Sequence, residues 1–410
     1  MNPLPLLAAG LRRRPAGLLC IVLLIAVAVA LGVAASSAAR ALRQGSADAA
    51  GAFDLLIGAP GSQTQLVLTS VYLQPAALPL VDGRLMNELA ADPGVAAVAP
   101  IGFGDFHLGF PIVGTDADFA TRWGTVPLAE GRMFRRRDEV VVGAGIAWPL
   151  GTAFHPTHGQ RHAVEDDDDE AAHQHQDLTY TVVGRLAPQG TPWDRAILAP
   201  IESVWWIHGL ADGHPAGSPP TLLGAPWDAA SLSGVPALVV KPKSIADAYR
   251  LRDRYRRGGT MALFPAEVLI GLYATLGDAR TLVAALALAT QVLVVAAALL
   301  AILANLAARR REFAVLRALG AGRRHLFLLV WLEVEALVLA GGLLGLGLGW
   351  AGALVLARIF QDRTGVVLPV ELGRPEALLV AGLAAAGALL ALLPAALAYR
   401  SPVAAALRGS

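Results

Sequence analysis

The sequence predicts an α-helical membrane protein with four transmembrane helices, arranged as one plus three, and a large α/β domain inserted between helices 1 and 2. Hydrophobic residues make up 55% of the 410 residues and charged residues only 16%, whereas an average soluble domain has about 25% charged residues. The apolar residues gather in four stretches that each satisfy the roughly 20 residues needed to cross a bilayer core. The long segment between the first two stretches has the mixed composition of a folded domain.

The four predicted membrane spans are residues 16–38, 281–308, 326–357 and 377–399. The first span is also similar to a secretory signal peptide, because three arginines precede it and small residues end it. Its apolar run exceeds the usual 7–15 residues of such a signal, which favours a retained anchor over a cleaved segment. The third span would reach about 48 Å as a helix, against a bilayer core of about 30 Å, so part of it must stand outside the hydrocarbon.

The third span contains two acidic residues, Glu333 and Glu335, about two turns from its basic end. One interpretation places both near the lipid headgroups, paired with neighbouring arginines. The other interpretation is a proton relay, because acids within a membrane are functional-site candidates. Their closeness to the basic end favours the first interpretation.

Arginine-rich segments predict the orientation of the chain. Short loops rich in arginine face the cytoplasm, which places the N-terminus 1–15, the loop 309–325 and the tail 400–410 on that side. The loop 358–376 balances acids against arginines and is predicted on the other side, together with the domain 39–280. The predicted location is therefore a bacterial inner membrane, with both termini in the cytoplasm and the large domain in the periplasm.

The segment 39–280 alternates strand-like and helix-like runs, which predicts an α/β periplasmic core domain. The strand-like runs, bounded by turn residues, are 53–57, 66–68, 139–142, 180–183 and 237–240. The helix-like runs are 84–91, 244–257 and 265–276. Ser244 and Asp247 have the spacing of a helix-capping pair.

Residues 155–177 interrupt this pattern and predict an exposed loop without hydrophobic periodicity. Five of the nine histidines lie here, beside six consecutive acidic residues. Imidazole and carboxylate groups suit zinc, nickel or copper(II). The candidate metal ligands are His155, His158, His162, His173 and His175. The alternative is a solvated polar insertion that binds no metal.

The loop 309–325 is too short and too charged to cross a membrane. Residues 312–319 predict a short helix, and Gly320 lies where a C-terminal cap glycine belongs. Apolar residues recur at every third position, at Phe313, Leu316 and Leu319. Such a stripe is typical of a helix that inserts into a cytoplasmic partner, and a helix lying on the membrane surface is the alternative.

Three glycines of the third span, Gly341, Gly345 and Gly349, form a ladder of small residues that lets helices approach closely. This spacing predicts helix packing, and we expect a second copy of the chain to lie along that face. Flexibility of a lipid-facing helix is the alternative.

The sequence contains no pattern for ATP hydrolysis or other catalysis. A phosphate-binding loop of the type G-x-x-x-x-G-K-[ST] needs a lysine after glycines, and Lys241 and Lys243 follow no glycine-rich run. The single Cys20 excludes disulfides and cysteine-based metal cages. The net charge of +1 leaves no broad basic surface for nucleic acid. We therefore expect a non-catalytic protein with no directly bound cofactor, so any ATP hydrolysis must come from another polypeptide.

Several motifs resemble those of the FtsX-like permeases of ABC transporters, a family that contains macrolide-exporter and lipoprotein-releasing permeases. The most specific match is residues 310–321, followed by two arginines and Glu333. Residues 393–395 and 401–408 are similar to the C-terminal signature of the family. Upstream, residues 130–134, 139–143 and 150–151 are similar to its periplasmic core domain.

This resemblance implies a permease subunit that pairs with a separate cytoplasmic ABC ATPase, which binds the ATP, and that works as a dimer with a second permease copy. It implies that the helix 311–320 docks on the ATPase and that motion then passes through the membrane helices to the periplasmic domain. The implied ATPase-coupling residues are Arg311, Glu312, Phe313, Leu316, Arg317 and Gly320.

The histidine-rich loop is not part of the family pattern and suggests a role in divalent metal handling, with zinc as one candidate ion. One alternative is a permease that exports or releases lipoprotein, peptide or drug. Another is a membrane scaffold that regulates a periplasmic enzyme, and a periplasmic protein is then the expected partner. A stand-alone secondary transporter is disfavoured by the small number of spans and the absence of broken-helix repeats.

Overall fold

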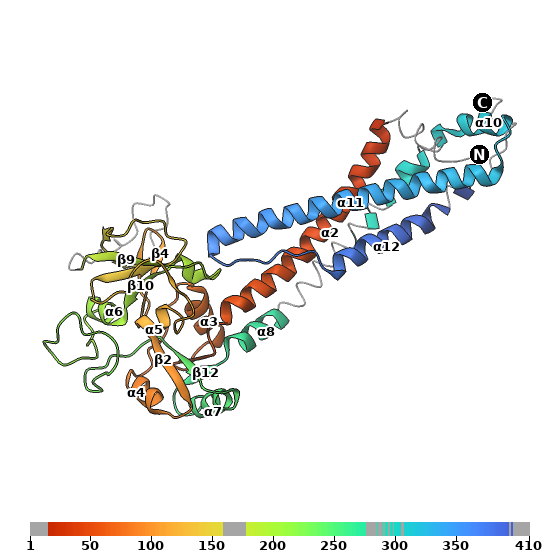
Figure 1. Ribbon diagram of the computed structural model, residues 1–410. Helices are drawn as coiled ribbons and strands as arrows, with labels where there is room; N and C mark the ends of the chain where they lie inside the picture. Colours follow the sequence, from red (N-terminus) through yellow and green to blue (C-terminus); the bar gives the residue numbers. More distant parts are fainter. Residues whose placement is uncertain are drawn as a thin grey trace, which may run out of the picture. The chain divides into compact units, whose positions relative to one another are not determined.

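The computed structural model (Figure 1) describes residues 15–158, 178–275 and 307–392, together with separate positions between 285 and 304 and residues 395 and 396. The chain forms two compact units. The helical unit comprises Met1–Gln44, Gly277–Ile359 and Leu368–Ser410, and the α/β unit comprises Gly45–Leu276 and Phe360–Val367.

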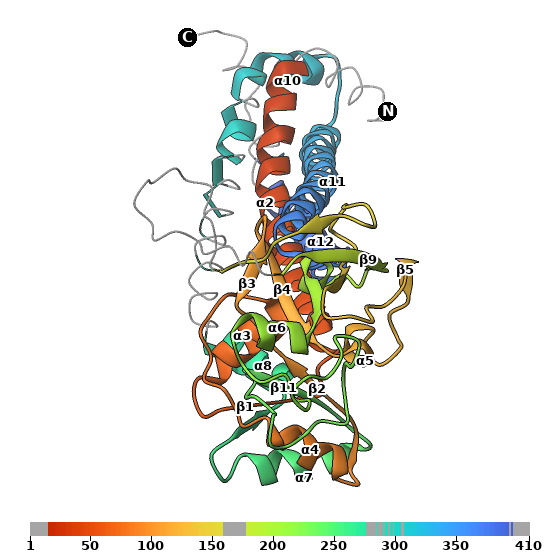
Figure 2. The same ribbon diagram turned by 90° about the vertical axis from the view of Figure 1, so that its left-hand side faces the viewer.

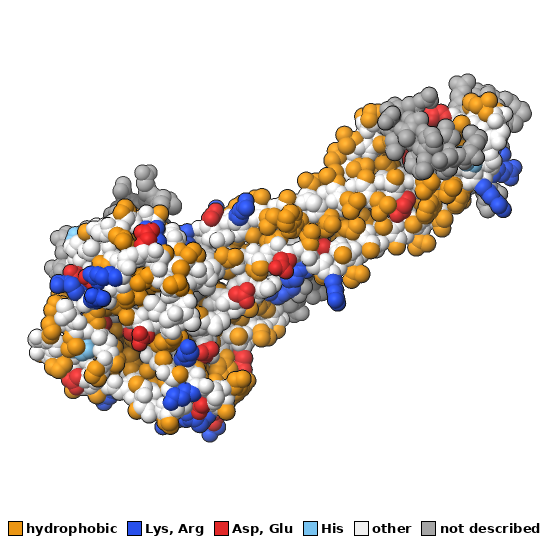
Figure 3. All heavy atoms as spheres, viewed as in Figure 1, with side chains coloured by type: hydrophobic (Ala, Val, Ile, Leu, Met, Phe, Trp, Pro, Cys, Tyr) orange, Lys and Arg blue, Asp and Glu red, His pale blue; other side chains and the backbone are white. Residues whose placement is uncertain are grey.

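Four helices carry most of the described part of the helical unit. They are α2 (Pro15–Ala50), α10 (Arg310–Ala318), α11 (Arg323–Thr364) and α12 (Arg374–Leu390). The ends of α2 and α11 extend into the α/β unit. Among the described residues, α2 and α11 are long and apolar enough to cross a membrane, and hydrophobic side chains cover much of the visible face of this unit (Figure 3). The span 281–308 lies mostly outside the described residues, and α12 covers only part of 377–399. The count of four spans therefore stays a prediction.

The glycine ladder lies against α2 of the same chain. A Cβ atom on Gly341 would lie 2.7 Å from the Cβ of Ile25, and one on Gly345 would lie 2.6 Å from the carbonyl oxygen of Ala26. One on Gly349 would lie 2.7 Å from a carbonyl oxygen of α2 as well. Because α2 fills this face, the expectation that a second copy lies along it is wrong. Close approach of two helix backbones is why small residues are needed here.

The α/β unit contains an antiparallel four-stranded sheet in the order β12-β1-β11-β2, of which Figure 2 labels β1, β11 and β2. Its strands are β1 (Leu55–Gly58), β2 (Val95–Ile101), β11 (Ala237–Pro242) and β12 (Met261–Leu263). Side chains alternate between the two faces of a strand. Leu55 and Ile57 therefore pack in one core cluster with α4 (Arg84–Ala91) and α7 (Ile245–Tyr255). Leu56 packs in another cluster with α3 (Gln63–Tyr72) and α8 (Pro265–Thr275), so both faces are buried.

A mixed eight-stranded sheet forms the rest of the α/β unit, in the order β5-β9-β6-β10-β4-β3-β8 with β7 paired to β9. The strands are β3 (Asp105–His107), β4 (Phe110–Thr115), β5 (Leu128–Gly131), β6 (Glu139–Val142), β7 (Ala153–Phe154), β8 (Thr157–His158), β9 (Tyr180–Leu186) and β10 (Ile197–Pro200). The pairs β10–β4 and β6–β9 are parallel. The remaining short helices are α5 (Ala117–Ala120), the 3-10 helix η1 (Pro192–Arg195) and α6 (Ile201–Ile207), which follows β10 directly.

Most predicted elements of this unit are confirmed. The predicted helix 84–91 is α4, and α7 begins after Ser244, whose hydroxyl accepts a hydrogen bond from the backbone N–H of Asp247. The predicted strand 66–68 is wrong, because these residues lie in α3. Ser62 caps that helix by accepting a hydrogen bond from the N–H of Gln65. Three apolar residues in a row fit a buried helix as well as a strand.

Candidate functional site

Helix α10 is a short element whose apolar residues face two directions. Phe313 is buried in a cluster with Leu326, Leu329 and Val330 of α11, and Leu316 packs against the same cluster. By contrast, Val315 is 46% exposed and Leu319 is 80% exposed. Of the predicted stripe, Phe313 and Leu316 therefore anchor α10 on α11, whereas Leu319 is exposed.

The C-terminus of α10 depends on Gly320, which has a φ of +95°. This left-handed conformation suits glycine and strains residues that carry a Cβ. Arg317 lies half-buried in the last turn, where a positive charge interacts favourably with the helix dipole. The side chain of Arg311 lies outside the described part of the structure.

A buried ion pair joins the residue before α10 to α11. The guanidinium of Arg309 donates to both carboxylate oxygens of Glu333, at 2.6 and 2.7 Å. The two side chains are only 11% and 6% exposed. Arg309 also donates to Glu312, at 3.1 Å, and lies 5.2 Å from the ring centroid of Phe313. For Glu333, the predicted pairing with an arginine is confirmed.

A second buried glutamate, Glu376, lies in the first turn of α12. Its carboxylate accepts hydrogen bonds from the hydroxyl of Ser36 at 2.7 Å, from Arg40 at 2.9 Å and from the backbone N–H of Gly373 at 2.9 Å. Sequence reasoning treated Glu376 only as a loop charge. The available signal was its position three residues after Gly373, next to a proline, which is typical of a helix N-terminus.

The proposed metal ligands are described only in part. His162, His173 and His175 lie outside the described residues, as does the side chain of His158. The Nδ1 of His155 donates to the carbonyl oxygen of Leu178 at 3.0 Å, which leaves Nε2 as the acceptor nitrogen. Metal-ligating histidines are commonly oriented in this way. Among the described residues, no group of three His, Cys, Asp or Glu side chains could hold a metal ion.

The α/β unit also contains buried acids that the sequence did not reveal. Burial raises the pKa of Glu202, in the first turn of α6, to about 7, and it raises the pKa of Asp116 to about 7 as well. Both line a cavity of about 680 Å³ whose wall also carries Arg132. The carboxylate of Glu202 accepts a hydrogen bond from the N–H of Gly224 and lies 3.6 Å from the Nε2 of His214. These contacts hold the irregular segment that follows α6, which contains His214 and Gly224, against the first turn of α6.

Comparisons with known proteins agree with this architecture. Residues 18–254 match the model of the MacB-like periplasmic core domain, which is more than half of the chain, and residues 284–403 match the model of the FtsX-like permease C-terminal region. A search of curated proteins finds no match.

Two solved structures are similar to parts of the chain. The periplasmic region of MacB from Actinobacillus actinomycetemcomitans is 11% identical, with 53% of this chain and 92% of that chain covered and a TM-score of 0.32. The extracellular domain of the noncanonic ABC-type transporter YknZ from Gram-positive bacteria is 14% identical, with 51% and 98% covered and a TM-score of 0.30. On the strength of the two family models, the chain belongs to the FtsX/MacB-like family of ABC transporter permeases, membrane-embedded proteins that work with a cytoplasmic ABC ATPase.

Proposed function

We propose that this chain is the non-catalytic permease subunit of an ABC transporter, in which a separate ATPase moves α10 and α11 carries the movement to the periplasmic α/β unit. The observation that carries the proposal is the bidentate contact between Arg309 and Glu333. Because both side chains are buried, this contact makes α10 and α11 move as one body.

The outer face of α10 supplies the docking surface for the ATPase. Val315 and Leu319 are exposed apolar residues on a segment that is rich in arginine, while Phe313 and Leu316 hold the helix in place from the other side. A small apolar knob on a rigid base suits insertion into a groove of a partner protein.

Helix α11 is a suitable transmitter because it is continuous from Arg323 to Thr364. Forty-two helical residues span about 63 Å at 1.5 Å each. The segment that follows is fastened within the α/β unit, where the N–H of Val367 donates to the carbonyl oxygen of Gly190 at 2.9 Å. The guanidinium of Arg195 donates to the carbonyl oxygen of Asp362. Movement of α11 would therefore reach the loop before η1.

In the proposed orientation, the chain lies in a bacterial inner membrane with both termini and α10 in the cytoplasm. The proposed assembly has two permease copies on two ATPases. Since α2 covers the glycine face of α11, the second copy must use another surface.

The experiment that tests the proposal is co-purification and co-reconstitution with the cognate ATPase. We expect Leu319→Asp to lower ATPase binding, and Arg317→Glu to lower the stimulation of ATP hydrolysis. The matched control is Leu108→Asp, since Leu108 is 76% exposed but lies in the α/β unit. If no ATPase associates with the unmodified chain, or if Leu319→Asp and the control behave alike, the proposal is wrong.

A second proposal concerns the histidine-rich loop 155–177, which we assign to divalent metal handling. The supporting observation is the oriented imidazole of His155, at the start of the loop. Zinc titration of the full chain by calorimetry should give binding heat that disappears when His155, His158, His162, His173 and His175 are all replaced by alanine. Unchanged heat would remove the metal role and leave lipoprotein, peptide or drug export as the alternative. A co-purifying periplasmic enzyme without cargo movement would instead support a regulatory scaffold.

A further inference from the structure

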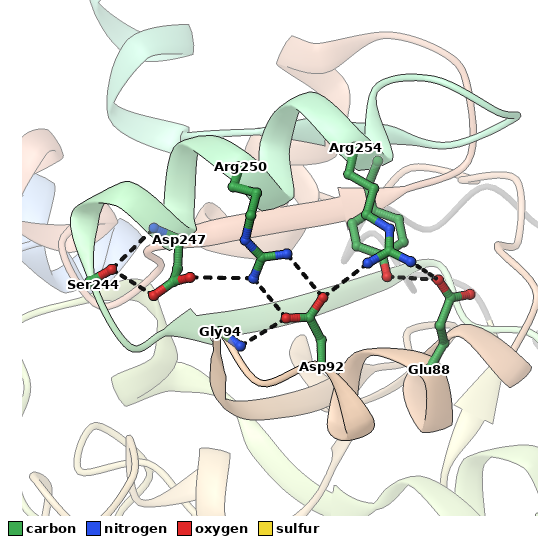
Figure 4. A network of polar contacts seen from close by, with 8 residues as sticks. Glu88, Asp92, Gly94, Ser244, Asp247, Arg250 and Arg254 are labelled. Carbon is green, nitrogen blue, oxygen red and sulfur yellow. Dashed lines mark hydrogen bonds and ion pairs between the residues drawn. The ribbon is translucent and has the colours of Figure 1, made fainter.

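Helix α7 carries arginines on two faces, and the arginines of one face pair with acidic residues of a neighbouring segment. Arg250 and Arg254, one turn apart, both donate to the carboxylate of Asp92, at 2.7 and 3.1 Å (Figure 4). Arg254 also lies 3.6 Å from Glu88. The acids of the neighbouring helix therefore balance the positive charge of this face.

The other face of α7 carries Arg252 and Arg256, which are likewise one turn apart. Both line a cavity of about 550 Å³ in the α/β unit. Among the described residues that line the cavity, Glu267 is the one acid, and it accepts a hydrogen bond from Arg252 at 2.7 Å. The described lining thus holds two guanidinium groups against one carboxylate, an excess of one positive charge.

The cavity combines this charge with an apolar floor. Leu263 and Phe264 form one part of the floor, and Val268 and Leu272 of α8 form another. The guanidinium carbon of Arg252 lies over the ring of Phe264, 4.5 Å from its centroid. A charged group above an apolar surface matches a ligand that has both an anionic head and a hydrocarbon part.

Polar donors of α3 lie at the same cavity. Gln63 and Thr64 line it and are the first two residues of that helix. Their backbone N–H groups have no carbonyl partner within the helix, and a helix N-terminus favours negative charge. These donors add to the cationic wall made by Arg252 and Arg256.

The position of the cavity in the sequence suggests the origin of such a ligand. Thr275, the last residue of α8, lines the cavity. The predicted second span begins at residue 281, and six residues reach at most about 20 Å. In this one respect the inference rests on the proposed function, which places this end of α8 near the outer surface of the membrane.

We infer that this cavity binds an anionic amphiphile, with the phosphate of a membrane phospholipid as the head and the start of an acyl chain as the apolar part. Arg256 and the N–H groups of α3 hold the head, and Phe264, Val268 and Leu272 hold the chain. Arg252 is a positioning residue, because Glu267 and the ring of Phe264 fix its guanidinium.

The test uses the full chain purified in a neutral detergent and titrated, by native mass spectrometry, with short-chain phosphatidylglycerol, short-chain phosphatidylcholine or inorganic phosphate. We expect saturable binding of phosphatidylglycerol that Arg256→Glu weakens by about tenfold or more, since charge-assisted contacts are lost and a repulsive charge is added. The matched control is Arg257→Glu, because Arg257 follows directly in sequence but does not line the cavity and pairs with Asp253.

A second variant fills the cavity without removing charge. Gly271 lines the cavity, and a Cβ added there would meet no atom within 4 Å. Gly271→Leu should therefore leave the fold intact and weaken phosphatidylglycerol binding, again by about tenfold. The inference would be overturned if Arg256→Glu and Arg257→Glu weakened phosphatidylglycerol binding equally. It would also be overturned if both Arg256→Glu and Gly271→Leu bound phosphatidylglycerol as tightly as the unmodified chain. Equally tight binding of inorganic phosphate or phosphatidylcholine would overturn the amphiphile assignment.

The assay contains no ATPase, so it stands apart from the proposed function. Cavity-dependent phosphatidylglycerol binding by a chain that captures no ATPase would refute the permease proposal and leave this inference intact. An ATPase-stimulating chain without such binding would refute only this inference.

Discussion

The two buried glutamates of the helical unit are held in different ways. Glu376, in the first turn of α12, accepts hydrogen bonds from Ser36, Arg40 and a backbone N–H. In the described part of the chain, Glu333 of α11 accepts its two short hydrogen bonds from Arg309. Among the described residues, the first carboxylate has several independent donors, whereas the second has one donating side chain.

We call the Glu376 contacts an anchor, because they tolerate the loss of one donor, and the Arg309–Glu333 pair a joint, because it does not. Loss of one donor leaves Glu376 bonded to the others, so α2 and α12 stay fastened. Loss of Arg309 leaves Glu333 as a buried charge without the partner that the described residues supply, and the start of α10 is then held on α11 by the apolar contacts of Phe313 and Leu316. We therefore expect the coupling function to depend on Arg309 and Glu333 far more than on Arg40.

The largest effect is expected for Arg309→Leu. Removing one partner of a buried ion pair costs about 3–5 kcal/mol, because the other charge stays buried. The unfolding temperature in detergent should fall, and stimulation of the partner ATPase should drop by about tenfold or more, as more than 1.4 kcal/mol of coupling is lost. The control Arg324→Leu removes an exposed arginine nearby and should change stability little. Wild-type stability and coupling in Arg309→Leu would contradict the distinction between joint and anchor.

A substitution of Gly345 in α11 tests whether α11 must pack closely on α2. A Cβ on Gly345 would lie 2.6 Å from both the carbonyl oxygen of Ala26 and the Cβ of Val29, whereas one on Gly347 would meet nothing within 4 Å. We expect Gly345→Leu to destabilise the chain by about 2–3 kcal/mol through forced separation of the helices. Thermal unfolding should show little change for Gly347→Leu, and equal effects of the two variants would rule out the observed packing.

The same comparison extends to Asp92 in the α/β unit, a carboxylate with several donors (Figure 4). Hydrogen bonds from Arg250 lower the pKa of Asp92 from its ordinary value of 3.8 to about 2. The ionised form therefore stabilises the folded state above about pH 4, and this contribution is lost as the pH falls toward 2. Asp92→Asn should cost about 2 kcal/mol at pH 7, through weaker charged hydrogen bonds.

Denaturant unfolding at pH 7, 4 and 2.5, followed by circular dichroism, checks this prediction. The gap between Asp92→Asn and the unmodified chain should shrink as the pH falls. A gap of constant size would show that the charge of Asp92 contributes nothing. Arg254→Gln removes a single donor and should have the smaller effect of the two variants at pH 7.

The smallest effect is expected for Arg40→Leu. The side chain of Arg40 is 30% exposed, and Glu376 retains Ser36 and the N–H of Gly373 as donors. We expect a loss of about 1 kcal/mol, within the range for one hydrogen bond to a charged group that keeps other donors. ATPase stimulation should be unchanged. If Arg40→Leu lowered ATPase stimulation as much as Arg309→Leu, both ion pairs would be needed to transmit the movement.

The elements that the sequence predicted well were those with local signals. Helix α4 is stopped at a Pro-Gly turn, α7 begins at a capping serine, and the run of valines in β6 has little alternative to a buried strand. The error at residues 66–68 arose because three apolar residues carry no periodicity. The serine cap at Ser62, three residues before Gln65, was the signal that could have corrected it.

Partners that lie far apart in the sequence were harder to predict. The sequence motif predicted a short helix at α10, but not that Phe313 and Leu316 face inward while Val315 and Leu319 face outward. That division depends on how α10 packs on α11. Similarly, the ladder of glycines that includes Gly345 predicted close helix packing. Only the three-dimensional structure shows that the neighbouring helix is α2.

The central claim is that α10 and the α/β unit lie on opposite sides of the membrane. The most direct test replaces Cys20 by serine and places single cysteines at Leu319, which is exposed after α10, and at Ser218, which is partly exposed in the α/β unit. A membrane-impermeant thiol reagent added to cells with a permeabilised outer membrane should label Cys at 218 at once, and should label Cys at 319 only after the inner membrane is opened. Labelling of both positions from the same side would contradict the account.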